Sequence, residues 1–223
     1  MSTSANYVRV AAEHIDLLQK DLIDAWYDLH LSADYPDKYP DVNDILNDLP
    51  GDVEILTIDG WEVLSWLLSP LKREETRRRA ARQLVEQDSW PAIDLPLVAI
   101  EARDSQLGVP AVDFGLGEGA AFDPTTVQRL SAALSQITPE DLLRNFDFDT
   151  MHRINLRGFG RSFIPDEEEK SAEEKRAAEE RAAEELAKEE RLARECVNRD
   201  FQALQQFYRR AAASGQYLII GFA

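Results

Sequence analysis

The segment VNRDFQALQQFYRRAAASGQYLIIGF, residues 197–222, decides the fold of this chain. Its apolar residues recur at every third or fourth position, the spacing of a helix that packs against a core. These residues are Val197, Phe201, Leu204, Tyr208 and Ala211. Gly215 is the type of residue that ends a helix, and the apolar run 217–222 after it predicts a closing strand.

The preceding residues, 166–190, are rich in alanine, glutamate, lysine and arginine, with 12 acids and 5 bases for a net charge of −7. Acids and bases at helical neighbour spacing can stabilise a helix without a core. An unbroken helix over 166–213 would be roughly 70 Å long. Because that exceeds a domain of this size, the acidic end either projects as an arm or breaks near Ser171 and folds back. We favour the arm, and expect a single domain, 1–223, with a charged helical extension at 166–196 inserted before the last core helix.

The rest of the chain shows shorter periodic segments. Strands are predicted at 7–10, 97–100 and 109–114, and helices at 11–31, 41–49, 61–68 and 146–154. Two further helices are predicted to begin at Asp123-Pro124 and Thr138-Pro139, each with a side-chain cap before proline. Residues 72–82 form a basic helix with six cations and two acids. These elements predict an α+β fold: a small mixed β-sheet surrounded by helices, with a long C-terminal charged helix and a closing C-terminal strand.

The net charge of −17 limits the classes of partner. Nucleic acids and anionic membrane surfaces both attract cations, so an acidic chain suits neither, whereas a basic protein partner is permitted. No apolar run approaches the roughly 18 residues that a membrane span needs, and the N-terminus has no signal-peptide pattern. The single cysteine, Cys196, fits a reducing compartment, and its place beside Val197 predicts a buried side chain. We therefore expect a cytoplasmic protein.

No metal or cofactor site is predicted. The three histidines, His14, His30 and His152, are far apart in the sequence and none stands at metal-ligand spacing from a cysteine or an acid. The glycines of 115–119 follow a predicted strand, but they lack the spacing and the Lys-Ser/Thr ending of a phosphate loop. A turn that needs glycine explains them better.

Four separated stretches occur in a characteristic order: 6–10, 58–61 with the leucines after it, 113–117, and 204–212 before Gly215. In this order they resemble the YfbM-like family, a bacterial domain of unknown function. The similarity covers most of the chain except roughly 32–52 and 166–190, which look like insertions. The resemblance implies a small α+β domain with a mixed sheet, and no reaction. The chain departs from the family at Ser65, where relatives place histidine, and at 154–157.

Three hypotheses about function follow. The first is a non-enzymatic binding protein that acts through its acidic surface on a protein partner, with an immunity or inhibitor role as one concrete version. The second is an enzyme or small-ligand domain, whose pocket would gather the candidate binding residues Tyr7, Arg9, Asp59, Trp61 and Asp113. For Asp59 and Trp61, helix capping and core packing are the simpler interpretation. The third is a structural protein that forms homo-oligomers through the long helix.

Overall fold

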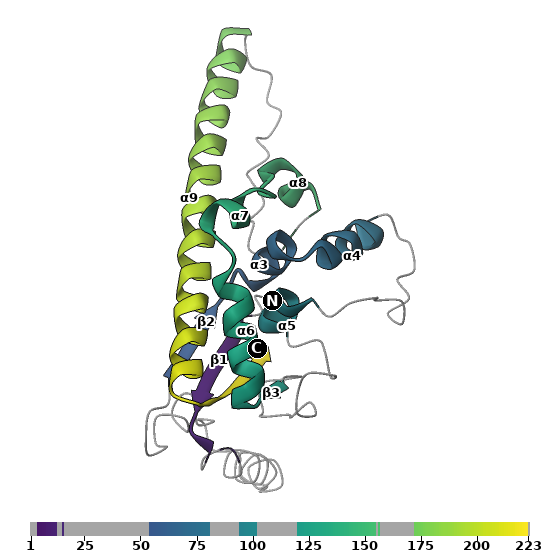
Figure 1. The fold of residues 1–223 in the computed structure, drawn as a ribbon. Helices are drawn as coiled ribbons and strands as arrows, with labels where there is room; N and C mark the ends of the chain where they lie inside the picture. The colour runs from purple at the N-terminus through teal and green to yellow at the C-terminus, as the bar shows by residue number, and fades with distance from the viewer. Residues whose placement is uncertain are drawn as a thin grey trace, which may run out of the picture.

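A computed structural model describes residues 4–12, 15, 54–80, 94–101, 120–154, 156 and 172–222 of the 223-residue chain. Within these residues the strands are β1 Ala5–Val10, β2 Glu54–Ile58, β3 Ala120–Phe122 and β4 Tyr217–Phe222. The helices are α3 Trp61–Leu68, α4 Pro70–Ala80, α5 Leu95–Glu101, α6 Pro124–Ser135, α7 Pro139–Leu143, α8 Phe148–Arg153 and α9 Ala172–Ala213. The predicted α+β fold is confirmed (Figure 1).

The four strands form one sheet in the order β2-β1-β4-β3. Every pairing of the described strands is antiparallel, whereas we had predicted a mixed sheet. Tyr7 stands opposite Leu56 of β2 and Ile220 of β4. The closing strand predicted from the end of the sequence is therefore confirmed, and it occupies a central position between β1 and β3.

The core lies between the sheet and the helices gathered over one of its faces. Alternate residues of β1, Ala5 and Tyr7, point into this core, where they meet the buried side of α9. That side consists of the predicted stripe: Val197, Phe201, Leu204, Tyr208 and Ala211 are all buried. The C-terminal part of α9 packs against α6, which covers the strands in Figure 1.

The two predicted capped helix starts are confirmed, and the helix predicted at 146–154 is found as the shorter α8, which also has a side-chain cap. Asp123 accepts a hydrogen bond from the backbone N–H of Thr126 at the start of α6. Thr138 and Asp141 form a reciprocal capping box at the start of α7. Asp147 accepts from the Thr150 N–H in the first turn of α8. Each cap satisfies a backbone donor that has no partner within its own helix.

Two further predictions are wrong. Residues 97–100 were predicted as a strand, but they lie in α5, whose first turn is capped by Asp94 through the Leu97 N–H at 3.1 Å. A short apolar run that is buried on all sides has no periodicity to separate helix from strand. Cys196 is exposed and not buried, because it lies one residue away from the stripe that begins at Val197. The segments predicted at 11–31, 41–49 and 109–114 lie mostly or wholly outside the described residues.

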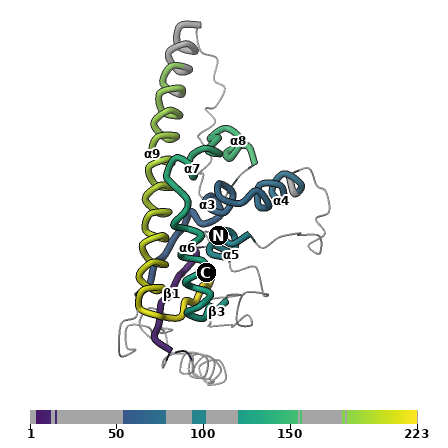
Figure 2. The backbone as a smooth tube through the Cα atoms, in the orientation of Figure 1, coloured from purple at the N-terminus to yellow at the C-terminus, as the bar shows by residue number. Residues whose placement is uncertain are grey.

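Helix α9 is continuous over its 42 residues, which corresponds to roughly 63 Å. Figures 1 and 2 show it running past α7 and α8, so that its N-terminal part extends beyond the rest of the described structure. Gly215 ends it with a φ of 62°, a conformation that glycine adopts without strain. Residues 166–171 lie outside the described residues, so the predicted arm is described as a helix from Ala172 onward, and the choice between an unbroken helix and a break near Ser171 stays a prediction.

Candidate functional site

Tyr7 is a core residue whose hydroxyl group forms a hydrogen bond within the protein. It is fully buried, and its hydroxyl donates a hydrogen bond to the Ile100 carbonyl at 3.1 Å. Tyr208 of α9 donates in the same way to the Ala99 carbonyl at 2.7 Å. The two tyrosines therefore satisfy carbonyl groups in the last turn of α5, which have no partner within that helix. Burial, and then the nearby Glu101 carboxylate, raises the pKa of Tyr7 well above its ordinary value.

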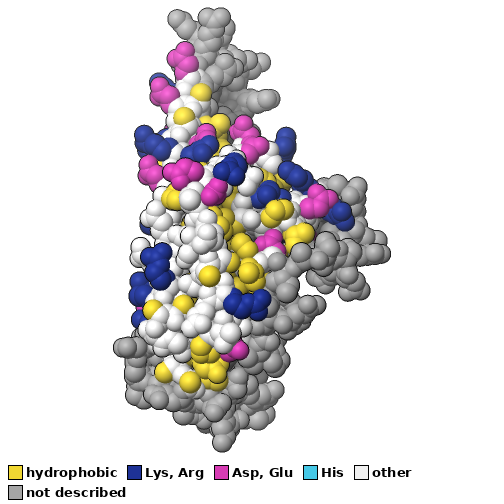
Figure 3. Space-filling view, viewed as in Figure 1, with side chains coloured by type: hydrophobic (Ala, Val, Ile, Leu, Met, Phe, Trp, Pro, Cys, Tyr) yellow, Lys and Arg dark blue, Asp and Glu magenta, His cyan; other side chains and the backbone are white. Residues whose placement is uncertain are grey.

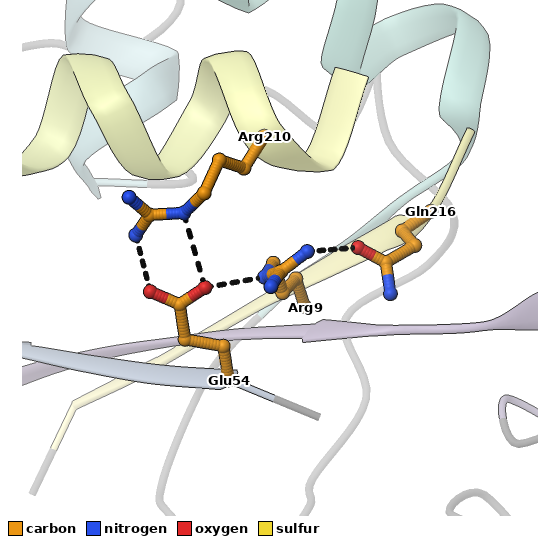
Figure 4. A network of polar contacts seen from close by, with 4 residues as sticks. All are labelled: Arg9, Glu54, Arg210 and Gln216. Atoms are coloured by element: carbon orange, nitrogen blue, oxygen red, sulfur yellow. Dashed lines mark hydrogen bonds and ion pairs between the residues drawn. The ribbon is translucent and has the colours of Figure 1, made fainter. Parts of the chain in front are cut away.

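Arg9 belongs to a polar network that joins two strands to the C-terminal part of α9 (Figure 4). Its Nε donates to Glu54 Oε2 at 2.7 Å, and its Nη1 donates to Gln216 Oε1 at 2.8 Å. The guanidinium of Arg210 also binds the Glu54 carboxylate, through its Nε and Nη2. Arg9 and Glu54 are directly opposite in the β1–β2 register, so the sheet itself positions this pair.

The other two candidates among the described residues are Asp59 and Trp61. They follow the last residue of β2, at the opposite end of that strand from the Arg9–Glu54 pair. Asp59 is exposed and accepts a hydrogen bond from Ser4 Oγ at 2.6 Å. It does not cap α3, whose N-cap position is Gly60. Trp61 is half-buried, with its ring tilted against Phe222 at 4.8 Å between centroids. Lys72 Nζ lies over the Trp61 ring at 5.7 Å from its centroid, which is a cation–π contact.

The structure does not gather the candidate binding residues in one place. Arg9 pairs with the first residue of β2, whereas Asp59 follows the last one. Since strands rise by about 3.3 Å per residue, the two residues are separated by roughly the length of β2. Tyr7 lies between them but is directed into the core. Asp113 lies outside the described residues, so its part in a binding site stays a prediction.

A buried ion pair next to Trp61 is the site that sequence reasoning missed. Lys72 Nζ of α4 lies 2.6 Å from Glu101 Oε1 of α5, and both side chains are at most 5% exposed. Two buried charges require each other, because either one alone would pay a large desolvation cost. The signals in the sequence were an acid directly after an apolar run and a lysine in the first turn of a helix. Neither signal says which distant charge is the partner.

A second link joins the same two helices at their N-termini. Ser69 Oγ accepts from the Lys72 N–H at 2.9 Å and donates to Asp94 Oδ2 at 2.7 Å. Asp94 in turn caps α5. Arg73 donates from Nη1 to the carbonyl groups of Trp66 and Leu67 at the end of α3. These contacts attach the first turn of α4 to α3 and α5.

In contrast to the first turn of α4, which contacts the core, the N-terminal part of α9 is exposed. From Glu180 to Leu192 every described side chain except that of Glu190 is exposed. Leu186 and Leu192, 41% and 46% exposed, are the exposed large hydrophobic residues of the described part. Figure 3 shows acidic, basic and a few hydrophobic side chains interspersed along this projecting part of α9. We call residues 172–192 the arm. Its base is marked by Arg194, which stacks on Phe146 at 4.3 Å and pairs with Glu190.

Within the described residues, no three histidine, cysteine, aspartate or glutamate side chains come together in a way that could hold a metal ion. In the same part of the chain, none of the helices has the length and apolar character that crossing a membrane requires.

The similarity of this chain to known proteins is weak. No protein-family model matches the chain, and no curated protein matches it. Among solved structures, it is similar to YfbM from Escherichia coli, a protein of unknown function, over 99% of both chains with 14% sequence identity and a TM-score of 0.49. Membership of the YfbM-like family, inferred from four stretches of sequence, therefore stays a prediction.

Proposed function

We propose that this protein is a non-enzymatic binding module, which uses the arm of α9 and its acidic surface to hold a basic protein partner. The observation that carries the proposal is the exposure of the arm from Glu180 to Leu192. A helix of this kind gains little from packing, and helices in isolation are only marginally stable in water. A partner that covers the arm would supply the contacts that the described part of the chain does not provide.

The chemistry of the arm favours a protein as that partner. Residues 172–190 carry eight acids and four bases, for a net charge of −4. Leu186 and Leu192 add apolar surface of the kind that is buried at protein interfaces. Charged residues around such anchors steer a partner of opposite charge and weaken its binding as salt increases. An inhibitor that covers a basic active site is one version of this function.

A retention experiment with three variants tests the proposal. Wild-type protein, the arm variant Leu186→Ala/Leu192→Ala and the control variant Gln128→Ala/Arg129→Ala are immobilised and exposed to extract from the source cells. The control pair is exposed on α6, away from the arm. We expect wild type and control to retain the same basic protein at low salt, and the arm variant to lose it. Retention that is equal in all three, or no retained protein at low salt, contradicts the proposal.

A further inference from the structure

We propose that two copies of this chain associate reciprocally, with the basic outer side of α4 in each copy lying against the acidic residues Glu180 and Glu184 on the arm of the other. The outer side of α4 is defined by Arg77 and Arg78, both of which are exposed. This inference goes beyond the proposed function, since it concerns a second copy and does not depend on a foreign partner.

The charges of the two elements complement each other. Helix α4 carries five cations and two acids in Pro70–Ala80, for a net charge of +3, whereas residues 172–190 carry −4. Two of the α4 cations contact the neighbouring helices. Lys72 pairs with Glu101 of α5, and Arg73 donates hydrogen bonds to carbonyl groups at the end of α3. Arg77 and Arg78 remain on the outside, where Arg78 contacts Glu74 of its own helix.

Each element also contains like charges one helical turn apart. Glu180 and Glu184 stand at i and i+4 on the arm, as do Arg73 and Arg77 on α4. Such pairs destabilise a helix slightly. The pKa of Arg73 is lowered, first by burial and then by the charge of Arg77, although Asp94 opposes this effect. Opposite charges brought in by another molecule would relieve the repulsion on both helices.

The two elements of one chain do not meet. Figures 1 and 2 show α4 directed away from α9 on the other side of α3, and the ion pairs of α4 run to α5 and to its own Glu74. Within the part of the chain that the structure describes, the arm therefore does not pair with α4 of its own chain, and a second copy can supply the complementary surface. A two-fold arrangement uses both contacts at once and leaves neither α4 nor the arm open for a third copy. Lys72 and Ser69 attach the first turn of α4 to α5, which fixes the direction in which the helix presents its arginines.

Analytical ultracentrifugation with charge-reversed variants tests this proposal. The charge-reversed arm variant is Glu180→Lys/Glu184→Lys, and the charge-reversed α4 variant is Arg77→Glu/Arg78→Glu. Circular dichroism checks that both remain folded. We expect wild type to dimerise at about 0.1 M salt and to dissociate at about 1 M salt, where the Debye length falls to roughly 3 Å. Each variant alone should dimerise at least about tenfold more weakly, since its reversed surface now meets like charge.

The decisive sample is an equimolar mixture of the two variants. In a mixed pair the lysine arm meets the glutamate α4, and the unchanged arm meets the unchanged α4, so both contacts are attractive. We expect the mixture to dimerise as wild type does. The control variant Glu140→Lys/Asp149→Lys changes the same number of exposed acids on α7 and α8 and should have no effect. Wild type that stays monomeric at low salt, or a mixture that stays monomeric, overturns the proposal.

The leucine variant of the retention experiment separates this inference from the proposed function. Leu186→Ala/Leu192→Ala leaves all four charged residues in place, so it should dimerise as wild type even if it no longer retains the basic partner. Loss of dimerisation in this variant would mean that the contact is apolar, which contradicts the charge pairing proposed here.

Discussion

The two halves of α9 have the same backbone conformation and opposite surroundings. In the C-terminal half, Phe201, Leu204 and Tyr208 are fully buried against the sheet and α6. In the N-terminal half, Leu186 and Leu192 are more than two-fifths exposed. Helix formation is therefore driven by packing at one end and by local side-chain pairs at the other. One long helix is thus part of the core at one end and part of the surface at the other, and its function should be sought where its packing stops.

Substitutions in the two halves should differ most in their effect on stability. Phe201→Ala removes a fully buried ring, and we expect it to lower the free energy of unfolding by about 3–5 kcal/mol because it leaves a cavity. Leu186→Ala on the arm should change it by no more than about 0.5 kcal/mol. Urea unfolding followed by circular dichroism measures both. Similar losses in the two variants would mean that the arm is packed.

The loss of a buried ion pair should likewise lower the free energy of unfolding more than the loss of a partly exposed one. Lys72→Met should destabilise the protein by about 3–5 kcal/mol, because the buried Glu101 carboxylate loses its ion pair with Lys72. Adding Glu101→Leu should recover much of that loss. Glu190→Gln, which breaks the partly exposed pair with Arg194, should cost only about 0.3–0.5 kcal/mol. Unfolding curves of the four proteins check this order, and a double variant no better than Lys72→Met would contradict it.

The buried tyrosines predict a loss of stability at high pH. Burial is the main cause that raises the pKa of both Tyr7 and Tyr208, so each keeps its proton in the folded state. Above the ordinary value of 10.0 the unfolded chain releases those protons and the folded one does not. Stability is therefore intact below pH 10 and falls above it, by about 1.4 kcal/mol per pH unit for each tyrosine. Urea unfolding at several alkaline pH values measures the slope, and Tyr7→Phe should halve this contribution.

Breaking the network around Glu54 should lower the free energy of unfolding by less than breaking the buried ion pair. Glu54→Ala leaves the guanidinium groups of Arg9 and Arg210 without their shared carboxylate, while Gln216 still accepts from Arg9. We expect a loss of about 1–2 kcal/mol, since Arg9 is mostly buried. The control Thr57→Ala removes an exposed cross-strand hydrogen bond to Asn6 on the other side of the same strand. Its loss should be smaller, and an equal loss would mean that the network adds nothing specific.

Local patterns made the helices and the closing strand predictable. The stripe from Val197 to Ala211 has a clear period, and the caps at Asp123 and Thr138 act within three residues of the helix start. The apolar run of α5 was misread, since it has no polar side from which a period could be recognised. The contact between Lys72 and Glu101 could not be predicted, because it joins residues that only the fold brings together. For the same reason, the sequence did not show that Arg9 and Asp59 lie at opposite ends of β2.

Hydrogen exchange along α9 tests the central claim most directly. The measurement follows amide deuteration of peptides from the arm and from the buried half, in dilute protein at about 1 M salt, where charge-driven association is screened. If the arm is helical without packing, its amides should exchange through local fraying, whereas those of 197–211 should exchange only on global unfolding. Equal, strong protection in the two halves would show that the arm is covered within its own chain and would contradict the account.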